Sequence, residues 1–233
     1  MRFLPNQILC GALALSAASS AVAADGAARN ATLLGTYQSI ADGRVLPGGL
    51  KNQGSPAQIQ PLTSAARPRP GEPGQQDPYA LCQAVGPFRM MAQPATKIEL
   101  VPAPGRVVML FEDVSHGYLR SLYLDRPHLQ NYQPKYAFQG DSIAHWEGDA
   151  LVIDTIGFNE RTWLNEQILA SDALHLVERI RPIDKGRYLE YRMTATDPKS
   201  LRTAYSYTRY FEKTDAQIEE DTCVINNAWN PAL

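Results

Sequence analysis

The chain has 233 residues, of which 44% are hydrophobic and 20% are charged, a composition that is typical of globular proteins and excludes a disordered chain. Its 22 Lys and Arg residues nearly balance its 24 Asp and Glu residues, for a formal net charge of −2 at pH 7. Nucleic-acid binders need a basic surface that neutralises phosphates, so this balance argues against a nucleic-acid partner.

The first 23 residues have the pattern of a secretory signal peptide. Arg2 precedes an uncharged apolar stretch, Ile8 to Ala18, and Ala21-Val22-Ala23 has the small-x-small pattern that signal peptidase recognises. The apolar stretch is shorter than the roughly 20 residues that span a bilayer comfortably. We therefore expect a periplasmic or secreted protein, with residues 24–233 as one domain that has no stable membrane span. An uncleaved anchor and lipidation at Cys10 are the alternatives.

Cleavage after Ala23 leaves two cysteines, Cys82 and Cys223. An even pair in an exported protein predicts a disulfide. The bond would close a loop of about 140 residues and stabilise the fold by about 4–5 kcal/mol in the chain-entropy model. Two free buried thiols are the alternative.

Residues 33–40 predict a short strand, and residues 47–78 predict a long extended loop on the outside of the domain. This loop holds seven prolines, which lack a backbone donor and disfavour helices. Runs rich in β-formers predict further strands at residues 97–101, 106–112, 120–125, 141–146, 150–155, 173–181, 187–196 and 203–212. Glu147-Gly148-Asp149 is the turn of a hairpin, and only residues 160–171 suggest a short helix.

Strands this dense, without helices between them, imply antiparallel pairing. A single sheet of about eight strands tends to close or to split into two sheets. We therefore expect an all-β fold, an antiparallel barrel of about eight strands, which leaves room for one small ligand. A two-sheet β-sandwich is the alternative.

A long motif in the second half of the chain resembles a known family. The run from Gly140 to Thr155 (G-x-S-x-x-x-W-E-G-D-x-L-V-x-D-T) resembles a large family of exported bacterial proteins, most of which are described only as hypothetical. The resemblance covers about residues 77–227 and implies no particular activity. It extends to the segments Leu122-Tyr123-Leu124-Asp125, Arg126-Pro127-His128, Gly157-Phe158-Asn159, Thr162-Trp163-Leu164, Ala173-Leu174-His175, Val177-Glu178-Arg179 and Thr196-Asp197-Pro198.

Two further short segments bear on the metal site and on the fold. Many members of that family carry a His-Pro-His-like segment where this chain has Ile168-Leu169-Ala170-Ser171, and this departure argues against a metal site. Gly35-Thr36-Tyr37 is similar to the Gly-x-Trp that opens the first strand of lipocalin-like (calycin) barrels. The second resemblance implies a lipocalin-like barrel, in agreement with the strand count.

The sequence lacks the common cofactor and nucleophile motifs. The four histidines, His116, His128, His145 and His175, form no His-x-His or His-x-x-x-His pair and no zinc-type cluster with cysteine. There is no glycine-rich phosphate loop before a helix and no Gly-x-Ser-x-Gly elbow. We therefore expect no metal and no cofactor.

Three ionisable residues lie within predicted strands on the same face as apolar residues. By strand alternation, Arg120 shares a face with Leu122, Asp154 shares one with Val152, and Glu178 shares one with Leu176. A charge on an apolar face is either paired or lines a cavity. The first alternative is a structural network, with Arg120 or Arg209 bridging Glu178 and Asp154. The second is a ligand pocket in which these groups act in acid–base chemistry.

Two histidines and several aromatic residues complete the candidate site. His145 is the candidate general base because it lies on a hairpin strand beside Trp146, and His116 lies in a loop that could reach the mouth of the barrel. The candidate ligand-stacking residues are the aromatic ones of the same region: Tyr136, Phe138, Trp146, Phe158, Trp163 and Tyr191.

These observations leave three functions open, each with a small molecule or none as the partner. The first is a cofactor-independent lyase or isomerase that acts on a small aromatic compound, with His145 or Asp154 as the base and Arg120 stabilising developing negative charge. The second is a periplasmic carrier of a small apolar or aromatic ligand, in which Arg120 pairs with a carboxylate or phenolate. The third is a structural envelope protein whose barrel is filled by side chains. The sequence leaves the oligomeric state open.

Overall fold

The computed structural model describes residues 32–62, 77–112, 117–131 and 138–219. The predicted signal peptide, His116, Tyr136 and Cys223 lie outside these residues, so the predictions that depend on them remain predictions. Within the described ranges, no helix is long and apolar enough to cross a bilayer.

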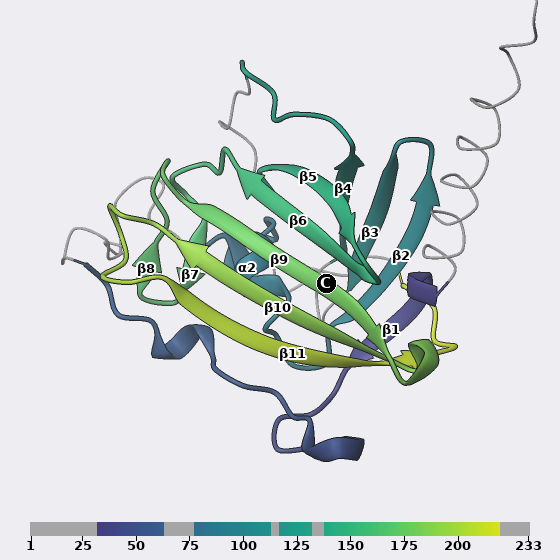
Figure 1. Cartoon of the computed structure of the whole chain (residues 1–233). Coiled ribbons are helices and arrows are strands. Elements are labelled where there is room, and N and C mark those ends of the chain that lie inside the picture. Colours follow the sequence, from purple (N-terminus) through teal and green to yellow (C-terminus); the bar gives the residue numbers. More distant parts are fainter. Residues whose placement is uncertain (1–31, 63–76, 113–116, 132–137, 220–233) are drawn as a thin grey trace, which may run out of the picture.

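Nine strands form a closed barrel, in the spatial order β1-β11-β10-β9-β6-β5-β4-β3-β2 (Figure 1). This confirms the predicted all-β barrel and excludes the sandwich. Each predicted strand is present, with ends that shift by a few residues. The strands are β1 (Gly35–Ser39), β2 (Lys97–Ala103), β3 (Arg106–Glu112), β4 (Gly117–Leu124), β5 (Asp141–Glu147), β6 (Ala150–Ile156), β9 (His175–Ile183), β10 (Tyr188–Thr196) and β11 (Tyr205–Thr214).

One strand pair departs from the predicted antiparallel pattern. β4 and β5 run parallel, and their register comprises only Tyr123 with Ile143 and Leu124 with Ala144. The remaining neighbours in the barrel pair antiparallel. The cause is the connection after β4, which brings the chain back to start β5 in the same direction instead of turning as a hairpin.

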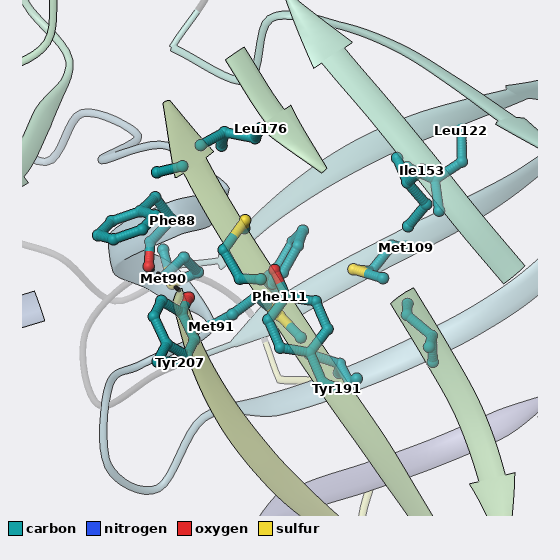
Figure 2. Close-up of a cluster of buried hydrophobic side chains, with 14 of the residues drawn as sticks. Phe88, Met90, Met91, Met109, Phe111, Leu122, Ile153, Leu176, Tyr191 and Tyr207 are labelled. Atoms are coloured by element: carbon teal, nitrogen blue, oxygen red, sulfur yellow. Dashed lines mark hydrogen bonds between the residues drawn. The ribbon is translucent and has the colours of Figure 1, made fainter. Parts of the chain in front are cut away.

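Alternation along the strands builds the interior. On β3, Val107, Met109 and Phe111 are buried while their neighbours are partly exposed. Side chains from β3, β4, β6, β9, β10 and β11 converge on the cluster shown in Figure 2, in which Met109 and Tyr191 are fully buried. Methionine fills irregular space because its side chain is long and unbranched.

A single helical turn, α2 (Pro87–Met90), packs against this cluster. Pro87 begins the helix because its fixed φ suits the first helical position. The Phe88 ring meets the Tyr207 ring edge-on at a centroid distance of 5.2 Å, and the Tyr207 hydroxyl donates to the Phe88 carbonyl at 2.5 Å (Figure 2). The turn thus fills space inside one end of the barrel with apolar side chains.

The prediction of a short helix at residues 160–171 is wrong. Two short strands, β7 (Trp163–Asn165) and β8 (Ile168–Leu169), form a separate two-stranded sheet there. The Asn165 side chain accepts a hydrogen bond from the Gln167 backbone at 2.8 Å, which stabilises a turn and ends any helix. The buried side chains of β7 and β8 then pack as strand residues.

The described part of the proline-rich segment follows the outside of the barrel. It contains the 3-10 turns η1 (Pro47–Gly49) and η2 (Pro56–Gln58), and η4 (Pro78–Leu81) follows the gap at residues 63–76. Isolated bridges join Gln53 to Thr208 and Pro61 to Leu201, so the segment is attached to the last strand and the turn before it.

Candidate functional site

The buried core of the candidate site is an ion pair between Arg120 on β4 and Glu178 on β9. The two guanidinium nitrogens Nη1 and Nη2 donate to Oε1 and Oε2 at 2.8 and 2.5 Å, and the two side chains are 1% and 0% exposed. Arg120 also donates to the hydroxyls of Ser142 at 2.9 Å and Thr155 at 2.6 Å. The Tyr191 hydroxyl donates to Glu178 at 2.8 Å. The structure therefore forms one half of the predicted network, the Arg120–Glu178 pair. Asp154 is not part of it, because this carboxylate contacts His128 and His175 instead.

Each side chain of this network has its hydrogen-bonding groups paired with another member. Burial, and then the adjacent Glu178 carboxylate, raises the pKa of Tyr191 well above its usual value, so the tyrosine remains a hydrogen-bond donor. A bidentate pair with additional hydrogen bonds offsets the cost of burying two charges. Because Glu178 neutralises Arg120, the predicted role of Arg120 as the anchor of a ligand anion is not supported.

The wall of the barrel opens next to this network. Since β4 and β5 pair over two positions only, a cavity of about 420 Å³ lies between their remaining parts. Leu119 and Leu129 flank the cavity and are 64% and 53% exposed. We call this cavity the β4–β5 seam. Its lining residues are Leu119, Arg120, Ser121, Tyr123, Arg126, Leu129, Gln139, Gly140, Asp141 and Ser142.

The β4–β5 seam contains a cation stacked on an aromatic ring and a buried amide without a hydrogen-bond partner in the described structure. The Arg126 guanidinium lies over the Tyr123 ring, 4.2 Å from its centroid, and so presents a cation and an aromatic face together. Both amide atoms of Gln139 are buried, and neither has a hydrogen-bond partner among the residues that the structure describes. An unpaired buried amide is costly, so Gln139 is a group that a polar contact would stabilise.

A chain of carboxylates and imidazoles lies on the outer face beside the seam. Asp141 on β5 contacts His128 Nδ1 at 3.0 Å, and His128 Nε2 contacts Asp154 on β6 at 2.8 Å. The other oxygen of Asp154 contacts His175 Nε2 on β9 at 2.8 Å. Because a neutral imidazole carries one N–H, both His128 contacts are hydrogen bonds only when its ring carries two protons. We call these four residues the outer chain.

The contacts of the outer chain stabilise the ionised form of its two carboxylates. Burial opposes ionisation of Asp141 and Asp154. Hydrogen bonds from Arg126, Leu129 and His128 to Asp141, and from His175 and His128 to Asp154, outweigh it and hold the pKa of both carboxyls below the usual range. The outer chain therefore ties the segment after β4 to β5, β6 and β9.

Two predicted catalytic residues lie on the outer face of the barrel, which corrects their expected placement in an interior pocket. The register pairs Ser142 with Thr155, and both point inward, so the alternate residues Asp154 and His145 point outward. The side chain of His145 is 54% exposed and contacts Glu147 at 3.2 Å. Asp154 does share a face with Val152, as predicted, but this apolar-looking face is the outer one.

The predicted aromatic residues do not gather around the seam. Phe158 and Tyr191 are buried in the main cluster, and Trp146 packs against that cluster from its edge. Trp163 is buried on β7, and Phe138 lies under the Arg161 guanidinium at 5.6 Å. None of these five lines the seam, whose aromatic residue is Tyr123.

Sequence reasoning missed Tyr123, Arg126, His128, Gln139 and His175. Only the long motif pointed to four of them, because Tyr123, Arg126, His128 and His175 all lie in its flanking segments. Strand alternation carried no such signal. Across the described ranges, no group of three or more His, Cys, Asp or Glu side chains is arranged to hold a metal ion.

Comparisons with known proteins add little beyond this geometry. No family model matches the sequence, and no curated protein matches it. A secretary abundant heat soluble (SAHS) protein from Ramazzottius varieornatus is similar in structure, with a TM-score of 0.43 and 10% identity over 78% of this chain and 96% of that one. The REP1-NXSQ fatty acid transporter has a TM-score of 0.41 and 10% identity over 80% of this chain and 99% of that one. No family is therefore assigned to this chain.

Proposed function

We propose that this chain is a binding protein for a small molecule with an apolar or aromatic body, which it holds in the β4–β5 seam. The observation that carries the proposal is the seam itself, a cavity of about 420 Å³ in the barrel wall with apolar, aromatic and polar groups around it. This volume lies in the range of about 300–1,000 Å³ that is usual for ligand sites. Exposed leucines at its rim favour an apolar guest over water.

The charges around the seam favour a neutral ligand with one polar end. Arg120 is paired with Glu178, and Arg126 is paired with Asp141 at 2.5 Å, so neither cation is free for a ligand anion. Gln139 offers both a donor and an acceptor that lack partners within the described part of the chain. A phenol or alcohol on an aromatic or aliphatic body is complementary to this set.

The same lining disfavours the lyase or isomerase alternative. No histidine is among the described residues that line the seam, and Asp141 is their only carboxylate. Asp141 already accepts from Arg126, His128 and the Leu129 backbone, which makes it a weak base. His145, the predicted general base, lies on the outer face in contact with Glu147.

Isothermal titration calorimetry with 2-naphthol, a neutral aromatic alcohol, tests the proposal. Leu119→Ser should weaken binding several-fold, because Leu119 is at the rim of the seam. Ser121→Trp should abolish binding because the indole fills the cavity. Val45→Ser is the matched control, since Val45 is 59% exposed and does not line the seam. Absence of binding, or equal binding by all four proteins, would contradict the proposal and favour a structural role for the barrel.

We also propose that the protein acts outside the cytoplasm, on the strength of the signal-peptide pattern in residues 1–23. Expression of the full chain in a Gram-negative host should yield a periplasmic product whose N-terminal residue is Ala24. Intact mass of the purified protein measures this directly. A product that keeps residues 1–23 in the cytoplasmic fraction would refute export.

A further inference from the structure

Arg209 on β11 is a buried cation that has no carboxylate partner. The residue is 5% exposed and lies on the inner face of the strand, between the buried Tyr207 and Phe211. Its Nη1 atom donates to the backbone carbonyls of Gln53 at 3.2 Å, Gly54 at 2.8 Å and Thr208 at 3.0 Å. No Asp or Glu in the described ranges lies within ion-pair distance of it.

Comparison with Arg120 shows that Arg209 lacks a counter-ion. Arg120 is buried to a similar degree, but Glu178 neutralises it with two bonds. Backbone carbonyls and the Tyr207 ring, whose centroid is 5.0 Å from the guanidinium carbon, supply Arg209 with partial charges only. A buried charge without a counter-ion is unfavourable by several kcal/mol. All three bonds of Arg209 start at Nη1. The Nε–Nη2 edge, which suits the two oxygens of a carboxylate, therefore has no acceptor in the described structure.

Arg209 lines a cavity of about 330 Å³ that is separate from the β4–β5 seam. A second buried arginine, Arg89 of α2, lines the same cavity and is paired with Asp77 at 2.8 Å. Four segments of the chain meet here: η2, the end of α2, the β7–β8 turn and β11. The lining residues are Asp42, Ser55, Pro56, Ala57, Arg89, Ala92, Gln93, Pro94, Asn165, Glu166, Gln167 and Arg209.

We propose that this cavity binds the carboxylate group of a small molecule through Arg209. Amide and hydroxyl side chains on the walls, such as Gln93 and Ser55, are suited to hydrogen bonding with a small polar ligand. The exposed carboxylates Asp42 and Glu166 also line the cavity. They repel a dianion and attract an ammonium group, so the site selects a monocarboxylate or an amino-acid-like zwitterion over phosphate.

This site is independent of the seam, because it uses β11 and α2 whereas the seam uses β4 and β5. A neutral aromatic alcohol tests the seam, and small anions test Arg209. Failure of one therefore leaves the other intact.

The test is a ¹H–¹⁵N NMR titration of the mature protein with acetate, glycine and inorganic phosphate. We expect saturable shifts at the amides of Gly54, Gln93 and Arg209 with acetate or glycine, and at least tenfold weaker binding of phosphate. Arg209→Gln should remove these shifts. Arg192→Gln is the control, because Arg192 lies on the neighbouring strand with its side chain 59% exposed and does not line the cavity.

Two surface variants keep the test valid if Arg209→Gln does not fold. Gln167→Glu adds a negative charge at the cavity and should weaken acetate binding several-fold. Glu166→Gln removes one and should strengthen acetate binding, and it should weaken glycine binding if the ammonium group pairs with Glu166. The proposal is overturned if neither acetate nor glycine binds, if phosphate binds more tightly than both, or if the variants at 166 and 167 leave acetate affinity unchanged.

Discussion

The buried charges of this barrel divide into two kinds. Arg120 is neutralised by Glu178 and bonded to two hydroxyls, whereas Arg209 contacts backbone carbonyls and the Tyr207 ring but no carboxylate in the described structure. The first arrangement satisfies its own members and stabilises the fold. The second leaves the guanidinium without a counter-ion, and the proposed carboxylate ligand would supply one.

The Arg120–Glu178 pair should be essential for stability. Glu178→Gln leaves a buried guanidinium without its counter-ion and should lower the free energy of unfolding by about 3–5 kcal/mol. Urea unfolding followed by circular dichroism measures this. Glu147→Gln is the control, since Glu147 pairs with Arg179 at an exposed position and its loss should have no measurable effect. Equal stability of the two variants would mean that the buried pair contributes nothing net.

The unpaired amide of Gln139 should be a local cost to the free protein. Gln139→Met keeps the length of the side chain and removes two buried polar atoms, so it should raise the free energy of unfolding by about 1 kcal/mol. The same variant should bind 2-naphthol less tightly. Gln130→Met, at an exposed position nearby, is the control. A Gln139→Met protein that is less stable than the control would show that the amide has a partner in solution.

At the scale of elements, the strands were predictable and two connections were not. Runs of β-branched and aromatic residues indicated all nine barrel strands, because these residue types favour extended backbone whether a strand alternates, as β3 does, or is buried on both faces, as β6 is. The β7–β8 hairpin was missed because its few residues give no clear period. The parallel β4–β5 pair was missed because pairing depends on the path of the connection, which composition does not specify.

The face of a strand that points inward was equally hard to predict. Alternation placed Asp154 with Val152, and both are on the outer face, where the outer chain covers the strand. The opposite face of β6 is also apolar, so the sequence gives two candidate inner faces. Glu178 was placed correctly because both Leu174 and Leu176 are fully buried beside it.

Because of the outer chain, the free energy of unfolding should decrease at acidic pH. The pKa of Asp141 and of Asp154 is lower in the folded protein than the usual value of about 4. Their contribution is therefore complete above pH 4 and is lost as pH falls through the lower folded values. Urea midpoints measured at pH 6 and pH 3 should fall steeply for the wild type and less steeply for Asp154→Asn. Equal losses in the two proteins would contradict a stabilising role for this carboxylate.

At the scale of the whole molecule, closure of the barrel explains where binding is expected. The central space is occupied by large side chains, Met109 and Tyr191 among them, so the described cavities lie in the wall and at one end (Figure 2). The short β4–β5 register is the weak point of the wall and forms the seam. A closed barrel with a lateral site differs from the central pocket that the sequence suggested.

The most direct test of this account is the location of bound 2-naphthol in the mature protein. A ¹H–¹⁵N NMR titration should shift the amides of residues 119–123 and 139–142, on the two sides of the seam. It should leave β10 unchanged, because β9 and β6 separate this strand from β5 in the barrel. Shifts centred on Tyr191 and Met193 instead would place the ligand in the middle of the barrel. That result, or no shifts at all, would contradict the seam as the binding site.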